Sequence, residues 1–221
     1  GLGNYDITYQ GGHLTIDPAT LTITADSGTS IYGQTVSAGG FHVAGLKGND
    51  DVSMVSLTTA ANSAASVGDY AVNAASAQGA GLENYAITYR SGDWSITPAA
   101  LTVTAGNQSL TYGATTLDPS RFAASGLVNG DQVTAVSLAS AAMSTSPVGS
   151  YEITASDAAG IGLSNYRVSY MPGILTVDPA DLVITANNQS MTYGSVPSLG
   201  MSGYTVSGLL NADTVSGVNL M

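Results

Sequence analysis

Apolar and hydroxyl-bearing side chains alternate along much of the chain, and this alternation is the period of a strand with one buried face. Residues 101–105, for example, read Leu-Thr-Val-Thr-Ala. The other segments with a strand pattern are 85–89, 94–96, 133–138 and 151–155. The pattern predicts a mainly β protein with little helix.

Two of these segments lie close together in the sequence. Residues 85–89 and 94–96 are separated by a short connection that contains Gly92. Two alternating segments joined through a glycine are typical of a β-hairpin. The sequence therefore predicts a hairpin here, with glycine at a positive φ in its turn. The glycines at this place in the pattern are Gly12, Gly92 and Gly173.

The whole pattern returns along the chain. The motif Asn-Tyr-x-[Ile/Val]-x-Tyr begins at Asn4, Asn84 and Asn165, which are 80 and 81 residues apart. Self-similarity at a fixed spacing is the sign of a tandem repeat. We divide the chain into the C-terminal strands of a preceding repeat (1–19), a first complete repeat (20–99), a second complete repeat (100–180) and the N-terminal part of a third repeat (181–221).

The joints between repeats are short and contain proline. Only residues 97–100, Thr-Pro-Ala-Ala, separate the last strand pattern of one repeat from the first of the next. Proline fixes φ and biases its predecessor to an extended backbone, so such a joint resists bending more than a glycine–serine tether. We expect an elongated array whose repeats have first and last strands running in the same direction. A β-grasp-like module, which we favour, and an immunoglobulin-like sandwich both have that geometry, and the incomplete repeats lead us to expect more repeats on both sides.

Acidic side chains greatly outnumber basic ones. The 221 residues include 15 Asp and Glu but four Lys and Arg, which gives a net charge of −11. Nucleic acids and anionic membrane surfaces repel such a chain. The absence of cysteine excludes disulfides and thiolate metal sites. No stretch approaches the ~18 consecutive apolar residues of a membrane span, so we predict no direct membrane insertion.

Taken as a set, the recurring motifs resemble the MBG repeat of the Tyr-Gly type. They are a Leu-x-[Val/Ile]-Thr-Ala strand before Tyr-Gly, a Gly-Leu-x-Asn-Gly-Asp element at 126–131, a Val-Gly-x-Tyr step and an Asn-Tyr-x-Ile-x-Tyr…Leu-Thr-Ile-x-Pro-Ala ending. Residues 48–49 (Gly-Asn) and 211–212 (Asn-Ala) depart from Asn129-Gly130, which affects the turn type. These mostly-β, glycine-rich modules occur in filamentous-haemagglutinin-like exoproteins and other large bacterial surface adhesins. The resemblance implies an extracellular stalk at the bacterial cell surface, often secreted by a two-partner route and used in biofilm formation or host attachment.

No residue pattern predicts a catalytic centre. The two histidines, His13 and His42, occupy different places in the repeat, so no two equivalent positions share an imidazole. The chain has no Gly-x-Ser-x-Gly elbow, no phosphate-binding loop and no His-Glu-x-x-His motif. We therefore predict that it is not an enzyme and that it has no catalytic residues and no cofactor.

The acidic residues of one recurring turn are weak candidates for binding calcium. Calcium takes six to eight oxygen ligands, whereas a single acid recurs at this turn. An aspartate that accepts N–H bonds from its own turn is therefore the favoured role, and a calcium ligand is the alternative. The candidates are Asp50, Asp51, Asp131 and Asp213.

Recurring aromatic residues leave a second function open. A tyrosine pair on one strand face recurs in each copy, which favours packing with the hydroxyl reaching a partner, while an exposed strip would favour carbohydrate binding. Trp94 takes the place of Leu14 and Leu175 and is predicted to be a core substitution. We expect stalk or spacer repeats that project a binding tip, partnered by neighbouring repeats and reaching extracellular polysaccharide or a host surface through other domains. The alternatives are carbohydrate-binding repeats and an accessory region of an extracellular enzyme. The paired tyrosines are Tyr5 and Tyr9, Tyr85 and Tyr89, and Tyr166 and Tyr170.

Overall fold

The computed structural model describes residues 1–196 and 203–219. Residues 197–202 and 220–221, which belong to the predicted third repeat, lie outside the described part. The prediction of a mainly β chain built from tandem modules is confirmed. The choice between a β-grasp-like and an immunoglobulin-like module stays a prediction. Among the described residues the helical elements are short 3₁₀ turns, and none is long and apolar enough to cross a membrane.

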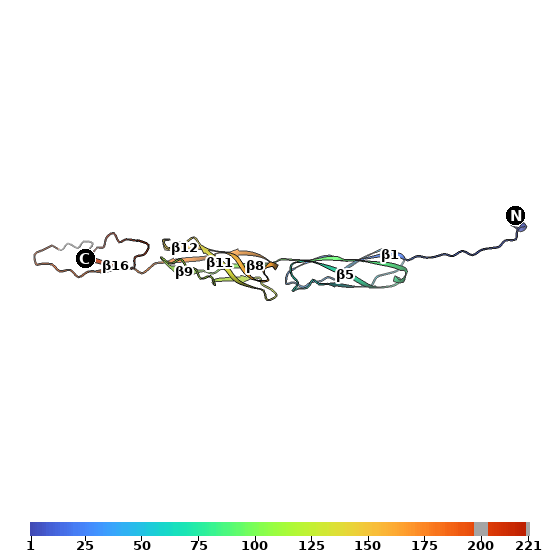
Figure 1. Ribbon diagram of the computed structural model, residues 1–221, viewed down its shortest axis with the longest axis horizontal. Helices are drawn as coiled ribbons and strands as arrows, with labels where there is room; N and C mark the ends of the chain where they lie inside the picture. The colour runs from blue at the N-terminus through green and yellow to red at the C-terminus, as the bar shows by residue number, and fades with distance from the viewer. Residues whose placement is uncertain (197–202, 220–221) are drawn as a thin grey trace. The chain divides into compact units, whose positions relative to one another are not determined.

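The first repeat folds into two sheets, with β1 and β5 marked in Figure 1. A three-stranded sheet has the order β3-β1-β6 and a four-stranded sheet the order β2-β7-β5-β4. A 3₁₀ turn, η2 (Leu82–Asn84), precedes β6. The strands are β1 (Ala19–Ala25), β2 (Gly28–Ile31), β3 (Phe41–Ala44), β4 (Met54–Thr59), β5 (Gly68–Gln78), β6 (Tyr85–Arg90) and β7 (Gly92–Thr97).

The second repeat has the same topology. Its sheets have the orders β10-β8-β13 and β11-β12-β14-β9. The described part of the third repeat contains the antiparallel pair of β15 (Val183–Ala186) and β16 (Tyr204–Ser207). The elements of the second repeat are β8 (Ala99–Ala105), β9 (Gln108–Thr111), β10 (Phe122–Ser125), β11 (Gln132–Ser140), β12 (Gly149–Ile161), η3 (Leu163–Asn165), β13 (Tyr166–Met171) and β14 (Gly173–Asp178).

Two long segments of each repeat cross from one sheet to the other. In the first repeat β1 leads directly into β2, and β6 leads directly into β7. The two segments lie side by side, because β1 pairs with β6 in parallel and β2 pairs with β7 in parallel. The predicted hairpin of residues 85–89 and 94–96 is therefore wrong. These segments follow one another in the same direction and belong to different sheets.

Glycine at this crossing permits close backbone approach. None of the three glycines predicted at positive φ adopts it among the described residues. A Cβ atom on Gly92 would lie 2.5 Å from the carbonyl oxygens of Ala25 and Asp26, and one on Gly173 would lie 2.5 Å from that of Ala105. Glycine is needed because the two crossing segments pass closer together than a side chain allows.

The core of each complete repeat lies between its two sheets. Leu21 and Ile23 of β1 are fully buried, and the apolar residues packed around them come from both sheets of the first repeat. In the second repeat the buried cluster consists of Ala105 from one sheet and Ile153, Leu175 and Val177 from the other. The alternating pattern explains this arrangement, since every second residue of these strands points inward.

The parallel pairs set the direction in which the chain passes through a repeat. The first and last strands of each complete repeat run the same way, as predicted. The chain thus enters at one end of a repeat and leaves at the other. Strand β7 ends at Thr97 and β8 begins at Ala99, so Pro98 alone separates these strands.

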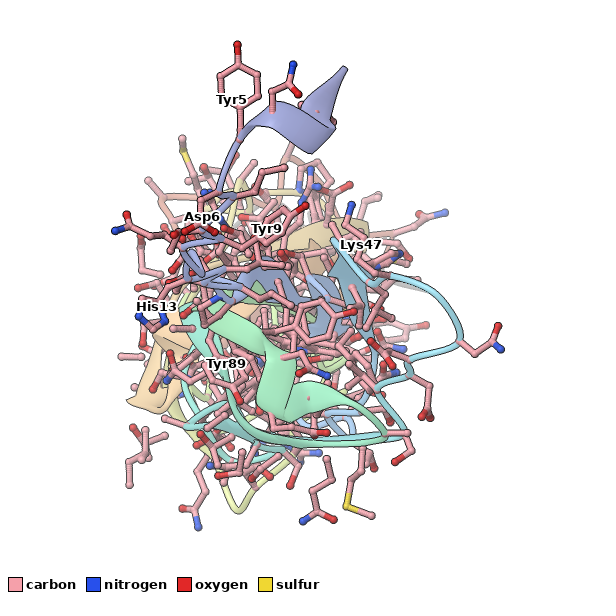
Figure 2. The ribbon with its side chains drawn as sticks, turned by 90° about the vertical axis from the view of Figure 1, so that its right-hand side faces the viewer. Tyr5, Asp6, Tyr9, His13, Lys47 and Tyr89 are labelled. Carbon is pink, nitrogen blue, oxygen red and sulfur yellow. The ribbon has the colours of Figure 1, made fainter. Side chains whose placement is uncertain are left out.

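The segment before β1 has no strand partner among the described residues. Leu2–Asn4 forms the 3₁₀ turn η1, as the equivalent residues do before β6 and β13, but residues 5–18 join no sheet. Tyr5 is 74% exposed, whereas its equivalents Tyr85 and Tyr166 are 8% exposed. Figure 2 shows the Tyr5 side chain pointing away from the rest of the chain. A strand pattern yields a strand only when a neighbouring strand can pair with it.

Candidate functional site

The acidic turn predicted as a calcium site is a tight turn that needs positive φ. In the second repeat the Asp131 N–H donates to the Val128 carbonyl at 3.0 Å, and Asn129 and Gly130 have φ of 55° and 80°. Asparagine and glycine tolerate this conformation better than other residues do. We call the loops that end at Asp50, Asp131 and Asp213 the acidic turns.

The departures from Asn-Gly change the backbone of the other two turns. In the first repeat Gly48 has a φ of 59°, whereas Asn49 does not have a positive φ. In the third repeat Asn211 and Ala212 have φ of 51° and 61°, as in the second repeat. An alanine thus occupies a conformation that carries a steric cost for residues with a Cβ atom.

Each acidic turn of a complete repeat is bound by a tyrosine from the same repeat. The Tyr85 hydroxyl donates to Asp50 Oδ2 at 2.7 Å and accepts from the Lys47 N–H at 2.8 Å. The Tyr166 hydroxyl donates to Asp131 Oδ2 at 2.8 Å. These are the first tyrosines of the Asn-Tyr motif, so the motif ties β6 or β13 to the acidic turn.

The Asp50 carboxylate also raises the pKa of Tyr85. The hydrogen bond to Asp50 raises the pKa of Tyr85 above the ordinary tyrosine value, because ionised Tyr85 would lose this bond and face a second negative charge. Burial of the ring raises the pKa further, and the Lys47 N–H lowers it. Tyr85 therefore stays a protonated donor at neutral pH.

These contacts place the four calcium candidates in structural roles. Asp50 and Asp131 accept from tyrosines of their own repeats, and Asp213 accepts from Tyr112 at 2.9 Å. Asp51 accepts from the Ala80 N–H at 3.0 Å. Across residues 1–196 and 203–219 no three His, Asp or Glu side chains gather as a metal site would require. Calcium binding stays a prediction.

In each complete repeat the second tyrosine of the pair binds a backbone N–H. The Tyr89 hydroxyl accepts from Ala77 at 2.9 Å, and the Tyr170 hydroxyl accepts from Ala158 at 2.9 Å. Tyr89 and Tyr170 are 37% and 39% exposed, so part of each ring faces solvent. Their hydroxyls support the irregular pairing of β5 with β4 and of β12 with β11.

The remaining candidates from the sequence are separate from one another. Trp94 is half-buried, its ring covers Gly28, and its indole N–H donates to Ser30 Oγ at 3.0 Å. The exposed His42 imidazole pairs with the Asp26 carboxylate. His13 lies in the exposed segment before β1, as labelled in Figure 2.

Both complete repeats resemble a known protein domain. The MBG domain of YGX type matches residues 21–95 and again residues 101–176. The chain belongs to the MBG domain family. No match was found among curated proteins. The two matched segments cover most of both complete repeats, so the sheets of these repeats, the acidic turns at Asp50 and Asp131 and their tyrosine contacts are features of MBG domains in this chain.

The sequence pointed to the acidic turn but missed its partners. Asp50 and Asp131 were expected to accept N–H bonds of their own turns, and the tyrosine hydroxyls that bind their carboxylates were not predicted. The Tyr-Gly element was expected only as a family motif, although Tyr112 also contacts an acidic turn. The available signal was the recurrence of tyrosine and aspartate at fixed places in each repeat.

Proposed function

We propose that these MBG repeats are stalk or spacer repeats of a large secreted bacterial adhesin. They act at the bacterial cell surface and carry a binding tip away from it, for biofilm formation or host attachment. Their contribution is geometric, and the proposal includes no catalytic role and no cofactor.

The parallel course of the first and last strands in each repeat carries this proposal. A chain that enters a module at one end and leaves at the other gains length with every module added. Each complete MBG repeat also has its own apolar cluster. Length and stability then grow with repeat number, as in other modular arrays.

The contacts of the recurring tyrosines support a structural role. Tyr85 and Tyr166 are buried and donate to carboxylates within their own repeats. Tyr89 and Tyr170 accept backbone N–H bonds. All four hydroxyls stabilise the repeat. Those of Tyr85 and Tyr166 both donate and accept, so a carbohydrate ligand would have to displace these bonds to reach them.

An exchange experiment in the parent adhesin tests the spacer role. One strain loses both complete repeats, and a second strain carries two unrelated β modules of similar length in their place. Cell attachment should fall in the first strain and recover in the second, because a spacer is defined by reach. Loss of attachment in both strains would overturn the proposal and favour ligand binding by the repeats.

A binding experiment on the isolated chain tests the alternative directly. The 221-residue chain is applied to an array of bacterial and host polysaccharides, and a Tyr89→Phe, Tyr170→Phe variant serves as the matched control. We expect no retained binding. Binding that the double variant loses would assign the tyrosines to carbohydrate recognition.

A further inference from the structure

The Tyr-Gly turn of the second repeat is fixed at the end where the chain leaves that repeat. The Ala114 N–H donates to the Thr111 carbonyl at 2.9 Å, and Gly113 has a φ of 95°. A positive φ at the third position is the requirement of a type II turn, which explains the glycine. The Tyr112 N–H donates to the Asp178 carbonyl at 2.8 Å, so the turn is held against the last residue of β14.

The same turn forms in all three copies of the motif. Gly33 and Gly194 have φ of 87° and 89°, and the turns close with bonds from the Gln34 N–H to Ile31 and from the Ser195 N–H to Thr192. The glycine keeps the turn tight and leaves the preceding tyrosine at its corner. A tyrosine that recurs at the same place in three turns of one chain indicates a common role for that side chain.

The Tyr112 side chain meets the acidic turn of the third repeat. Its hydroxyl donates to Asp213 Oδ2 at 2.9 Å. Leu210 of the same turn lies over the Tyr-Gly turn, since a Cβ atom on Gly113 would be 2.7 Å from Leu210 Cδ1. The Asn211 amide donates to the Ser144 carbonyl. Three residues of one acidic turn thus contact the preceding repeat.

Apolar residues surround this hydrogen bond. A cleft of about 200 Å³ lies at the joint between the second and third repeats. The hydrogen bond itself is exposed to solvent, so the apolar residues of the cleft also contribute to the joint. The contact needs no cation, and this suits a chain with four Lys and Arg in 221 residues. The lining includes Tyr112, Val148, Pro179, Leu182, Leu209 and Leu210.

From these contacts we infer that the Tyr-Gly turn is a docking surface for the acidic turn of the following repeat. The Tyr112 hydroxyl and the Asp213 carboxylate hold the two turns together, and Leu210 packs on the space that Gly113 leaves open. The joint is thereby fixed in direction as well as in length. This inference concerns the joint alone and holds whatever the repeats do at a cell surface.

Distance measurements between spin labels on the full 221-residue chain test the inference. The chain has no cysteine, so Ser137→Cys in β11 and Thr205→Cys in β16 place two labels on exposed strand positions of neighbouring repeats. Tyr112→Phe keeps the ring and removes the hydroxyl, and Asp213→Ala removes the acceptor. Tyr170→Phe is the matched control, because its hydroxyl accepts a bond inside the second repeat.

The docked joint predicts one narrow distance distribution in the parent and in Tyr170→Phe. Tyr112→Phe and Asp213→Ala should both replace the narrow peak with a broad distribution. A broad distribution in the parent, or a narrow peak kept in both variants, would overturn the inference. A second label pair, Thr104→Cys with Ser137→Cys, lies inside the second repeat and checks that this repeat stays folded. If Tyr112→Phe broadens the distance distribution of this second pair, Asp213→Ala alone decides the outcome.

Discussion

Truncation of one buried leucine should destabilise a single repeat. Leu21 in β1 and Leu101 in β8 are equivalent residues, and both are fully buried. A Leu→Ala change removes about three buried carbon atoms at ~0.8 kcal/mol each and leaves a cavity, so about 3 kcal/mol is expected within the usual range of 2–5 kcal/mol. With a urea slope of about 1.5 kcal/mol/M, the unfolding midpoint of the altered repeat should fall by ~2 M.

The single tryptophan makes the two repeats separately observable. Trp94 belongs to the first repeat, so its fluorescence follows that repeat, whereas far-UV circular dichroism follows both. Leu21→Ala should shift the fluorescence transition in urea. Leu101→Ala should shift part of the circular dichroism transition and leave the fluorescence transition in place. Equal fluorescence shifts in both variants would refute the reasoning, because they would mean that the two repeats unfold as one core.

Three further predictions concern single contacts. Because the pKa of Tyr85 is raised in the folded state, its contribution to stability is complete below the ordinary tyrosine pKa and is lost as pH rises through the folded-state pKa. The free energies of unfolding of the parent and of Tyr85→Phe should therefore converge as pH is raised. A difference that stays constant with pH would contradict this. Gly28→Gln should lower the free energy of unfolding by about 1–3 kcal/mol, because the new side chain would overpack against Trp94. Adding Trp94→Leu should restore the melting temperature, since Gln108 already faces Leu175 at the equivalent positions of the second repeat. Gly126→Ala should lower the melting temperature more than Gly130→Ala, because both glycines have positive φ but only Gly126 lies against the Ala100 carbonyl; equal losses would assign the cost to φ alone.

The strands were predictable because their signal is local. Alternation at residues 101–105 predicts a half-buried strand wherever its partners lie, and β8 has buried Leu101 and Val103 as that pattern requires. The course of the chain after Tyr89 was not predictable in this way. A hairpin and a straight passage between sheets have the same alternation, and the deciding contact joins Gly92 to carbonyl groups of β1 and the loop after it.

The tyrosine–aspartate contacts show the same limit. Recurrence marked both residues, but Tyr85 and Asp50 are 35 positions apart and nothing between them fixes which aspartate a tyrosine reaches. The sheet order β3-β1-β6 brings them together, because Tyr85 begins β6 and Asp50 follows β3, and pairing over such a distance depends on the whole repeat. The turn glycines were easier to interpret where φ is positive, as at Gly130.

The two parallel strand pairs also determine how a repeat responds to tension. If the ends of a complete repeat are pulled apart, the first segment is drawn backward and the last segment forward along their shared ladders, β1 with β6 and β2 with β7. The hydrogen bonds of both ladders are then loaded in shear and must break together, whereas a hairpin pulled at its ends would unzip one bond at a time. A repeat built in this way resists force along the chain more strongly than a repeat whose first and last strands form a hairpin.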